Sequence, residues 1–288
     1  MSERKEFIPI SDRHISPAVD TYQAIGERQE QQDRYLVSNL RDGLLLMVAD
    51  GHNGTGTSSL LAENTTQIYS EERAAVIAQD PDWTRWGLPA TKERLVIRRT
   101  IKRLIEMTDD DDSGSTLTLA FLQLGFRIRD RSLRLRAHVG QIGDSVFAFS
   151  SRPGALAMAP IHSVRMNDKD ASAIRQRYKD ENGAPCQQSN LYLYTGESGV
   201  GLAVTRALGD KAYTLIRAPE IKTFEADPDH ALVMLASDGM LNSEEDMRDQ
   251  VRSAIALLRE GMPLQELGEN YRMQDNITML AVRFPAEQ

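Results

Sequence analysis

The sequence predicts an α+β fold in which two antiparallel β-sheets pack together and helices cover their outer faces. Apolar runs with the length of buried strands recur along the chain, short turns join most of them, and a few amphipathic helical segments lie between them. The chain has 288 residues, 41% of them hydrophobic, which is enough for a substantial core. We therefore expect one domain over residues 21–288.

Composition and charge exclude several classes of function. No stretch approaches the roughly 20 apolar residues of a membrane span, so a membrane partner is not expected. A net charge of −8 without a basic stripe argues against nucleic acid as a partner. Residues 1–10 lack the apolar segment of a secretory signal, and the lone Cys186 leaves no disulfide framework. These features favour a cytoplasmic protein in which Cys186 is a bystander.

The N-terminal part of the chain predicts strands before helices. Residues 1–20 form a polar lead-in that contains Pro9 and Pro17, and little regular structure is expected there. Residues 21–40 predict a strand, a polar loop and a second strand. Leu44–Ala49 is an unbroken apolar run and predicts a strand that is buried on both faces.

Two helices are expected next. Residues 58–69 are compatible with a helix, and residues 92–107 place one apolar helical face on a sheet through Ile97, Ile101, Leu104 and Ile105. The four aspartates at 109–112 invite a metal site, but side chains adjacent in sequence rarely converge on one ion, so a solvated loop is the prediction. Residues 113–124 then predict a strand.

The middle of the chain predicts a strand, a turn and an insertion. Residues 133–138 form a strand whose less dry face carries Arg134, Arg136 and His138. The histidine is expected to be structural. A tight turn at 143–144 leads into the next strand. Residues 160–200 predict a flap-like surface insertion with a helix at 167–178, and residues 201–210 form an apolar segment that ends in a Gly-Asp turn.

The C-terminal part alternates between strands and helices. Residues 231–237 predict a strand, and residues 277–284 predict the last one. Between them, residues 244–258 and 264–271 predict helices, the first opened by Ser243 as its N-cap. No internal repeat is present.

Three of these apolar runs carry an aspartate at one end: Asp50, Asp238 and Asp275. If those ends converge, three carboxylates share a small volume, and protonation or a bound cation must relieve their repulsion. All-oxygen ligation favours Mg²⁺ or Mn²⁺, while five histidines without zinc-site spacing leave no closed zinc site. A plain Asp-Gly turn after a strand, or a purely structural carboxylate cluster, is the alternative.

Seven short blocks occur in a fixed order along the chain. They read GERQEQQD from Gly26, VADGHNG from Val48, SGSTLTL from Ser113, GQIGDS from Gly140, LAVTRALGD from Leu202, LASDG from Leu235 and DNITML from Asp275. In this order they resemble the metal-dependent protein phosphatase family, the protein phosphatase 2C type of Ser/Thr phosphatase, over residues from about 21 to 284. The resemblance implies an αββα sandwich with a metal centre in the cleft between the ends of the two sheets.

The resemblance also implies a role for each matching residue. A two-metal centre is held by four carboxylates and one backbone carbonyl, which correspond to Asp33, Asp50, Asp238, Asp275 and Gly51. Asp144 corresponds to an additional acid at a third, weaker metal site. Arg28 corresponds to the arginine that grips the substrate phosphate, and His52 to the proposed general acid. Residues 205–210 match a block that we interpret as structural.

The function that the resemblance implies is the hydrolysis of phosphoserine and phosphothreonine in proteins. Two Mg²⁺ or Mn²⁺ ions, with a third at the weaker site, would activate the attacking water. Phosphoproteins are the expected partners, and a monomer is assumed. Two alternatives stay open. One is a catalytically weak pseudophosphatase that acts as a regulatory binding module, and the other is a metallohydrolase of small phosphate esters or nucleotides.

Three positions depart from the family's pattern. Gln32 stands where many members have Glu, and its neutral amide changes the water contacts expected beside Asp33. Asn53 replaces a glycine that is common after the histidine, and asparagine tolerates the left-handed backbone that glycine adopts. Asn242 stands where many eukaryotic members have Asp, which bears on the affinity of the third metal site.

Substrate specificity is expected in the two least regular regions, residues 151–200 and 70–92. The second region contains Trp83 and Trp86, which form either a partner surface or ordinary packing.

Overall fold

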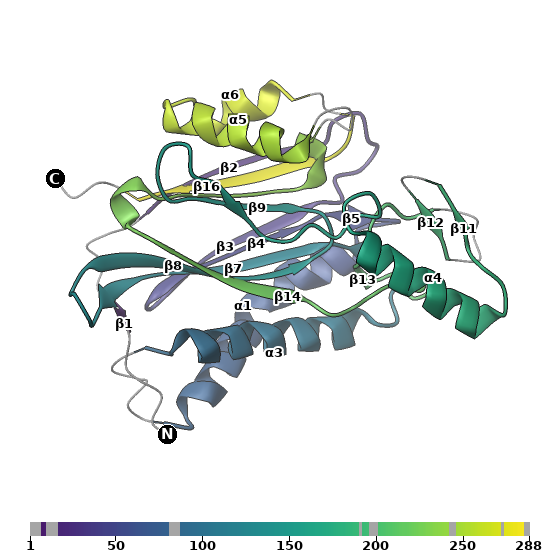
Figure 1. Ribbon diagram of the computed structural model, residues 1–288, viewed down its shortest axis with the longest axis horizontal. Coiled ribbons are helices and arrows are strands. Elements are labelled where there is room, and N and C mark those ends of the chain that lie inside the picture. The colour runs from purple at the N-terminus through teal and green to yellow at the C-terminus, as the bar shows by residue number, and fades with distance from the viewer. Residues whose placement is uncertain are drawn as a thin grey trace.

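Two antiparallel β-sheets stack face to face in the computed structural model, with helices on both outer sides (Figure 1). The structure describes residues 7–9, 17–80, 87–189, 192–195, 201–241, 246–271 and 274–284. The predicted arrangement of two sheets between helices is therefore confirmed.

The larger sheet has the strand order β14-β8-β7-β4-β3, and β1 pairs with the far end of β7. Its strands are β1 (Phe7–Pro9), β3 (Arg34–Leu40), β4 (Gly43–Ala49), β7 (Leu117–Arg127), β8 (Leu133–Ile142) and β14 (Glu220–Ala226). Neighbouring strands are antiparallel throughout, and short hairpin turns join β3 to β4 and β7 to β8.

The smaller sheet has the strand order β10-β9-β15-β16-β2. Its strands are β2 (Ala18–Ala24), β9 (Val146–Ser150), β10 (Ala157–Met158), β15 (Leu232–Ala236) and β16 (Ile277–Arg283). Strand β2, near the start of the chain, pairs with β16, near its end, so segments far apart in the sequence meet in one sheet.

Helices α1 (Gly56–Ile77) and α3 (Ala90–Thr108) cover the outer face of the larger sheet. Helices α5 (Met247–Arg259) and α6 (Leu264–Glu269) cover the smaller sheet. Figure 1 shows α4 (Asp168–Asn182) at one end of the sandwich, beside the hairpin of β11 (Gln187–Gln188) and β12 (Leu193–Tyr194). These last elements form the insertion, which we call the flap.

Strand β4 joins two cores, because successive side chains of a strand point to opposite faces. Leu44, Leu46 and Val48 pack between the sheets, and Leu45, Met47 and Ala49 pack against α1 and α3. All six are at most 3% exposed, which confirms a strand buried on both faces.

Five further short elements complete the fold of the described residues. A small sheet with the order β13-β6-β5 joins β5 (Gly51–His52), β6 (Gly114–Ser115) and β13 (Leu208–Gly209). Single 3-10 turns flank β15, η1 (Pro228–His230) before it and η2 (Asp238–Met240) after it.

Some sequence predictions need correction. Residues 1–20 are not structureless throughout, because Phe7–Pro9 pairs with β7 and β2 begins at Ala18. Helix α5 begins at Met247 and is capped by Asp246, whose Oδ1 accepts the N–H groups of the next turn. The predicted start at 244 after Ser243 lies outside the described residues, as do Trp83 and Trp86.

The face of β8 predicted to be less dry is buried at Arg136 and His138, while Arg134 near the start of the strand stays partly exposed. Arg136 and His138 are 6% and 1% exposed because α3 covers this face, where the side chains of Ile97 and Ile101 lie against Gly140. Arg136 pairs with Glu225 (Nε to Oε2, 2.7 Å). Burial lowers the pKa of His138 to about 3, so the ring is neutral, and its Nδ1 lies 3.0 Å from the Thr223 hydroxyl. This histidine is structural, as predicted.

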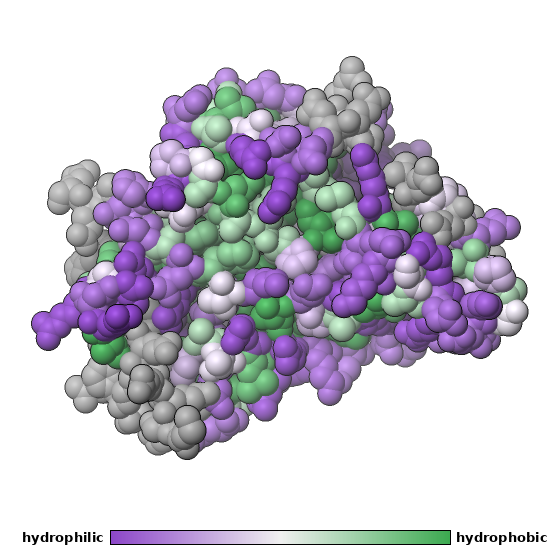
Figure 2. Space-filling view, in the orientation of Figure 1, coloured by the Kyte–Doolittle hydropathy of each residue, from purple (hydrophilic) through white to green (hydrophobic). Residues whose placement is uncertain are grey.

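The surface seen in Figure 2 is mostly hydrophilic over the helices, and apolar side chains are visible in its middle, where the edges of the two sheets lie. The edge strands β14 and β10 contribute the half-buried Phe224 and Met158. No helix in the described part of the chain is both long and apolar enough to span a bilayer.

The inter-sheet core should control global stability. Leu46→Ala removes a fully buried side chain between the sheets and should lower the free energy of unfolding by about 2–5 kcal/mol. Phe126→Ala is the matched control, because this side chain is 43% exposed, and should cost less than about 1 kcal/mol. Urea unfolding followed by circular dichroism measures both, and equal losses would contradict this assignment of the core.

Candidate active site

The aspartates predicted to converge lie at one end of the sandwich. Asp50 follows β4, and Asp33 precedes β3, its antiparallel neighbour, so both acids lie at the same end of the larger sheet. Asp238 follows β15 and Asp275 precedes β16, which are likewise antiparallel neighbours in the smaller sheet. The Ser237 N–H donates to the Thr278 carbonyl (2.9 Å) and ties these two ends together.

Electrostatic coupling shows that the acids of the two sheets lie close to one another. Burial raises the pKa of Asp50 well above its usual value, and the charges of Asp238, Asp33 and Asp144 raise it further. Asp50 and Asp238 also share a hydrogen bond. Although both keep part of their surface exposed, protein replaces most of the surrounding water, so burial is the largest cause of the shift.

The remaining acids belong to the same group. Burial raises the pKa of Asp33 to about 6, although the nearby hydroxyls of Ser237 and Thr278 lower it. Burial and the charge of Asp238 raise the pKa of Asp144 well above its usual value. The pKa of Asp238 is raised mainly by burial and further by Asp275, while Arg28 and His52 lower it. The structure thus brings together all the side chains predicted for the site.

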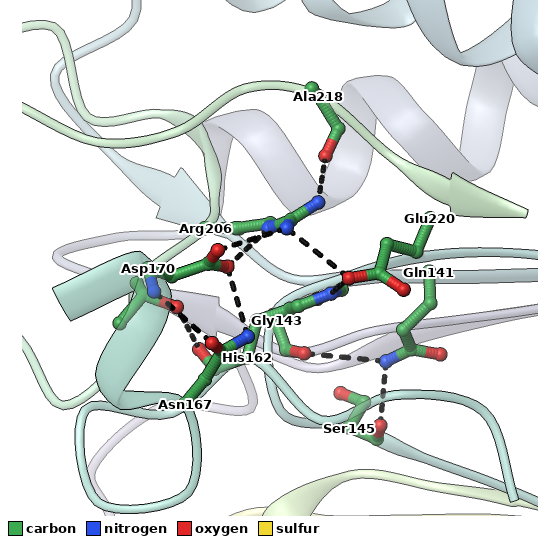
Figure 3. A network of polar contacts seen from close by, with 10 residues as sticks. Gln141, Gly143, Ser145, His162, Asn167, Asp170, Arg206, Ala218 and Glu220 are labelled. Atoms are coloured by element: carbon green, nitrogen blue, oxygen red, sulfur yellow. Dashed lines mark hydrogen bonds and ion pairs between the residues drawn. The ribbon is translucent and has the colours of Figure 1, made fainter. Parts of the chain in front are cut away.

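Residues at the start of β7 fix the position of Asp50. The Thr116 N–H donates to the Asp50 carbonyl (2.9 Å), and the Asp50 N–H donates to the Thr116 hydroxyl (3.1 Å). The same hydroxyl contacts the Ser145 hydroxyl (2.6 Å), next to Asp144. Gln141 holds this turn from the side, since its amide nitrogen donates to the Ser145 carbonyl (2.7 Å; Figure 3). One threonine therefore links two of the acids.

Gly51 allows a close approach of three chain segments. A Cβ atom at this position would lie 2.5 Å from the Gln32 carbonyl oxygen and 2.8 Å from the Ser58 hydroxyl, which themselves form a 2.6 Å hydrogen bond. When the side-chain amide of Gln32 is oriented so that both its nitrogen and its oxygen form hydrogen bonds, the nitrogen donates to the Gly51 carbonyl (3.2 Å). Asn53 has a φ of 58°, so the predicted left-handed conformation is confirmed.

Arg28 lies at the exposed edge of the group. Its Nη2 contacts the Asp275 carboxylate at 2.5 Å, and the two side chains are 56% and 41% exposed. Asn276 fastens the loop that carries Arg28, because its Oδ1 accepts the Gln32 N–H (2.7 Å) and its Nδ2 donates to the Ile25 carbonyl (2.8 Å). The guanidinium is thus held near the acids while remaining accessible from solvent.

His52 contacts an acid that the sequence reasoning missed. Its Nε2 lies 2.6 Å from Oδ2 of Asp210, a residue of the block interpreted as structural. That interpretation was incomplete. The signal was present, because Asp210 ends an apolar run after a glycine, as Asp144 does in its own turn.

The flap is fastened beside the Asp144 turn by a polar network. Arg206 binds Asp170 of α4 through two hydrogen bonds (2.6 and 3.1 Å), the Ala218 carbonyl (2.7 Å) and Glu220 of β14 (3.3 Å; Figure 3). The His162 N–H donates to the Gly143 carbonyl (3.0 Å). The base of the flap is therefore attached both to the larger sheet and to the turn that carries Asp144.

The donor chemistry fits a hard divalent cation. Both carboxylate oxygens of Asp33 are buried and accept no hydrogen bond within the usual distance from any described residue. All the candidate ligands are oxygens, which suit Mg²⁺ or Mn²⁺. Within the described ranges, no three His, Cys, Asp or Glu side chains are already placed to hold one ion, so binding requires these side chains to adjust. Asn242, which bears on the third site, lies outside the described residues.

Comparisons with known proteins concern the family and the fold. The family model "Protein phosphatase 2C" matches residues 22–261. Probable protein phosphatase 2C 52 of Oryza sativa subsp. japonica is 25% identical over 275 residues, covering 90% of this chain and 49% of the relative. Probable protein phosphatase 2C 76 of Arabidopsis thaliana is 24% identical, covering 90% and 57%. The chain thus spans about half the length of these curated relatives.

Solved structures share the fold. The serine-threonine phosphatase 2C of Toxoplasma gondii has a TM-score of 0.67 at 20% identity and covers 96% of this chain and 98% of its own. A C. elegans sex determining protein has a TM-score of 0.65 at 21% identity and covers 93% of this chain and 64% of its own. At this identity the likeness concerns the fold alone.

The raised pKa of Asp33 predicts a pH dependence of stability in the absence of cations. Asp33 binds a proton below about pH 6 in the folded chain, but only below about pH 3.8 in the unfolded chain. The charged, buried carboxylate therefore lowers the free energy of unfolding above about pH 6, and this loss disappears as the pH falls. In EDTA, lowering the pH from about 7.5 to about 5 should raise the free energy of unfolding of wild type by about 1 kcal/mol relative to that of Asp33→Asn.

Urea unfolding of both chains measures this difference. The comparison between chains is needed because the lowered pKa of His138 acts in the opposite direction in both. A wild type that loses stability relative to Asp33→Asn over this interval would contradict the buried environment described for Asp33.

Proposed function

The chain belongs to the protein phosphatase 2C family, and from this premise we propose that it is a metal-dependent enzyme that hydrolyses phosphoserine and phosphothreonine in proteins. One observation carries the proposal. Acids from both sheets gather at one end of the sandwich together with an accessible arginine and a histidine. This combination supplies ligands for cations, a cationic group for a phosphate and a proton donor for a leaving group.

Two divalent cations are proposed to bind to four carboxylates and one backbone carbonyl, those of Asp33, Asp50, Asp238, Asp275 and Gly51. Asp144 is proposed to contribute to a third site. Positive charge at this point offsets the cost of burial and the mutual repulsion that together raise the pKa values of these acids. When bound, such cations act as Lewis acids that lower the pKa of a water molecule and polarise a phosphoryl oxygen.

Arg28 is proposed to bind the phosphate of the substrate. A guanidinium presents donors in a planar fork that matches two phosphate oxygens. In the structure this fork faces Asp275, and the Arg28 side chain is 56% exposed, so an incoming phosphate can reach it from solvent. Orientation of the phosphate in this way lowers the entropic cost of attack.

His52 is proposed to donate a proton to the seryl or threonyl oxygen as the ester bond breaks. Its ring lies close enough to Asp238 for its charge to lower the pKa of that acid, and its side chain is 25% exposed. Proton donation by a positioned side chain typically contributes about 10²- to 10⁴-fold to the rate.

Metal dependence is the first test of the proposal. Purified protein with Mn²⁺ should release phosphate from a phosphothreonine peptide, and EDTA should abolish the activity because the acids then lack their cations. Asp238→Asn should lower kcat at least about 10²-fold. Asp109→Asn is the matched control, because Asp109 is 64% exposed and pairs with Arg217 at the surface, and should leave the rate unchanged.

Activity that survives EDTA, or a near-normal rate in Asp238→Asn, would contradict the metal-dependent mechanism. Mn²⁺ binding by calorimetry without turnover would instead favour a pseudophosphatase that acts as a binding module.

The role of Arg28 predicts a change in substrate binding. Arg28→Ala should raise KM for the phosphopeptide about 10-fold or more, because the phosphate loses its guanidinium partner. Arg129→Ala is the control, since Arg129 lies exposed in the turn between β7 and β8. Steady-state kinetics measures both variants, and an unchanged KM in Arg28→Ala would rule out phosphate binding by this residue.

A further inference from the structure

The carboxyl group of Asp210 is buried behind His52. Asp210 is 0% exposed and its Oδ2 lies 2.6 Å from Nε2 of His52, whose own side chain is 25% exposed. The imidazole therefore contacts a buried carboxylate on one side and keeps part of its surface exposed to solvent. Since Nε2 is occupied by the carboxylate, Nδ1 is the ring nitrogen left for another partner.

The small sheet β13-β6-β5 builds this contact. His52 of β5 pairs with Gly114 of β6, and Gly209 of β13 pairs with the same glycine from the other side. The side chains of His52 and Asp210 meet above Gly114. A Cβ atom on Gly114 would lie 2.1 Å from Nε2 and 2.2 Å from Oδ2. The absence of a side chain at this position is what lets the two groups touch.

The backbone around Asp210 is held in a conformation that few residues adopt. Asp210 has a φ of 51°, and the strain persists because hydrogen bonds on both sides fix the chain. Its N–H donates to the Ser113 carbonyl (3.0 Å), the Lys211 N–H donates to the Asp111 carbonyl (3.1 Å), and the Tyr213 N–H donates to the Asp210 carbonyl (2.9 Å). The carboxylate is therefore presented at a fixed place.

The remaining polar contacts of Asp210 are few. Its Oδ1 is buried and accepts no hydrogen bond from any residue in the described ranges. Burial of a carboxylate with one unpaired oxygen costs stability, so its contact with a single histidine requires an explanation. Packing does not supply one, because an apolar side chain would fill the same place without that cost.

We propose that Asp210 is a positioning residue that holds the His52 ring with Nε2–H toward the carboxylate and Nδ1 toward the scissile ester. The inference rests on the proposed role of His52. As the ester P–O bond breaks and its electron pair stays on the leaving oxygen, that oxygen takes the Nδ1 proton of the doubly protonated ring, which thereby becomes neutral. The ring keeps its Nε2 proton in the hydrogen bond to Asp210. Asp210 acts through His52 and touches neither substrate nor cations.

The first experiment observes the ring without any reaction. Long-range ¹H–¹⁵N correlation spectra of the Mg²⁺-loaded protein, with His52 assigned by its loss in His52→Gln, report which ring nitrogen carries the proton. At a pH where the ring is neutral, wild type should show a single state with the remaining proton on Nε2. Asp210→Ala should show mixed states, because no acceptor selects one of them. An unchanged His52 pattern in Asp210→Ala would overturn the proposal, whether or not the protein is an active phosphatase.

The second experiment compares leaving groups. A phosphothreonine ester releases a basic alkoxide that needs a proton, whereas p-nitrophenyl phosphate releases a stable phenolate that does not. Asp210→Ala should lower kcat on the phosphothreonine peptide about 10- to 100-fold and change kcat on p-nitrophenyl phosphate less than about 3-fold. Asp210→Asn, whose amide oxygen can still accept the Nε2 proton, should recover part of the loss.

A double variant tests whether the two residues act as one unit. His52→Gln combined with Asp210→Ala should be no slower on the phosphopeptide than His52→Gln alone. Multiplicative losses, or equal losses on both substrates, would overturn the proposal. A wild type without phosphatase activity would refute the proposed function instead, and the spectra would still decide the position of the ring.

A second buried carboxyl serves as the matched control. Glu93 is 0% exposed and binds Arg73 (2.8 Å) and Tyr69 (3.0 Å) between α1 and α3, away from the acid group. Glu93→Gln should affect both substrates equally and leave the His52 spectrum unchanged. Gly114→Ala should reproduce the leaving-group effect, because its Cβ atom would separate His52 from Asp210. A thermal melt of each variant verifies folding.

Discussion

Repulsion among buried carboxylates at one end of the sandwich is the constraint on which the rest of the structure depends. Asp33, Asp50, Asp144 and Asp238 come from different strand ends, and burial raises the pKa of each. Such a group costs stability unless protons or cations neutralise it. The cores on both sides of β4 and β15 offset this cost, because those strands are buried along almost their whole length.

The spacing of the acids is set by the sheets and by backbone contacts more than by the acidic side chains themselves. Thr116 joins Asp50 to the turn that carries Asp144, and Asn276 joins the Arg28 loop to the end of β16. Gly51 lets its backbone lie closer to the Gln32 carbonyl and the Ser58 hydroxyl than a side chain at this position would allow. The backbone of a site built on strand ends in this way is preorganised, and it is the acidic side chains that must adjust when a cation binds.

One segment connects the flap to the histidine at the cleft. Within residues 201–210, Arg206 fastens α4 to β14, and Asp210 four residues later contacts His52. The flap is therefore attached to the same stretch of chain that borders the acid group. The polar network around Arg206 is buried and paired, which suits an anchor better than a surface that exchanges partners.

The strands and their charged ends could be predicted from local sequence patterns. Unbroken apolar runs predicted β4, β15 and β16, and the ordered blocks around Asp50, Asp238 and Asp275 predicted which acids would meet. Period and composition are local properties, so they can be read from residues that are neighbours in the chain. The pairing of Asp210 with His52 and the burial of Arg136 and His138 under α3 were decided only by the way distant segments pack together. Each depends on which distant segment lies opposite a given residue, and no local pattern encodes that neighbour.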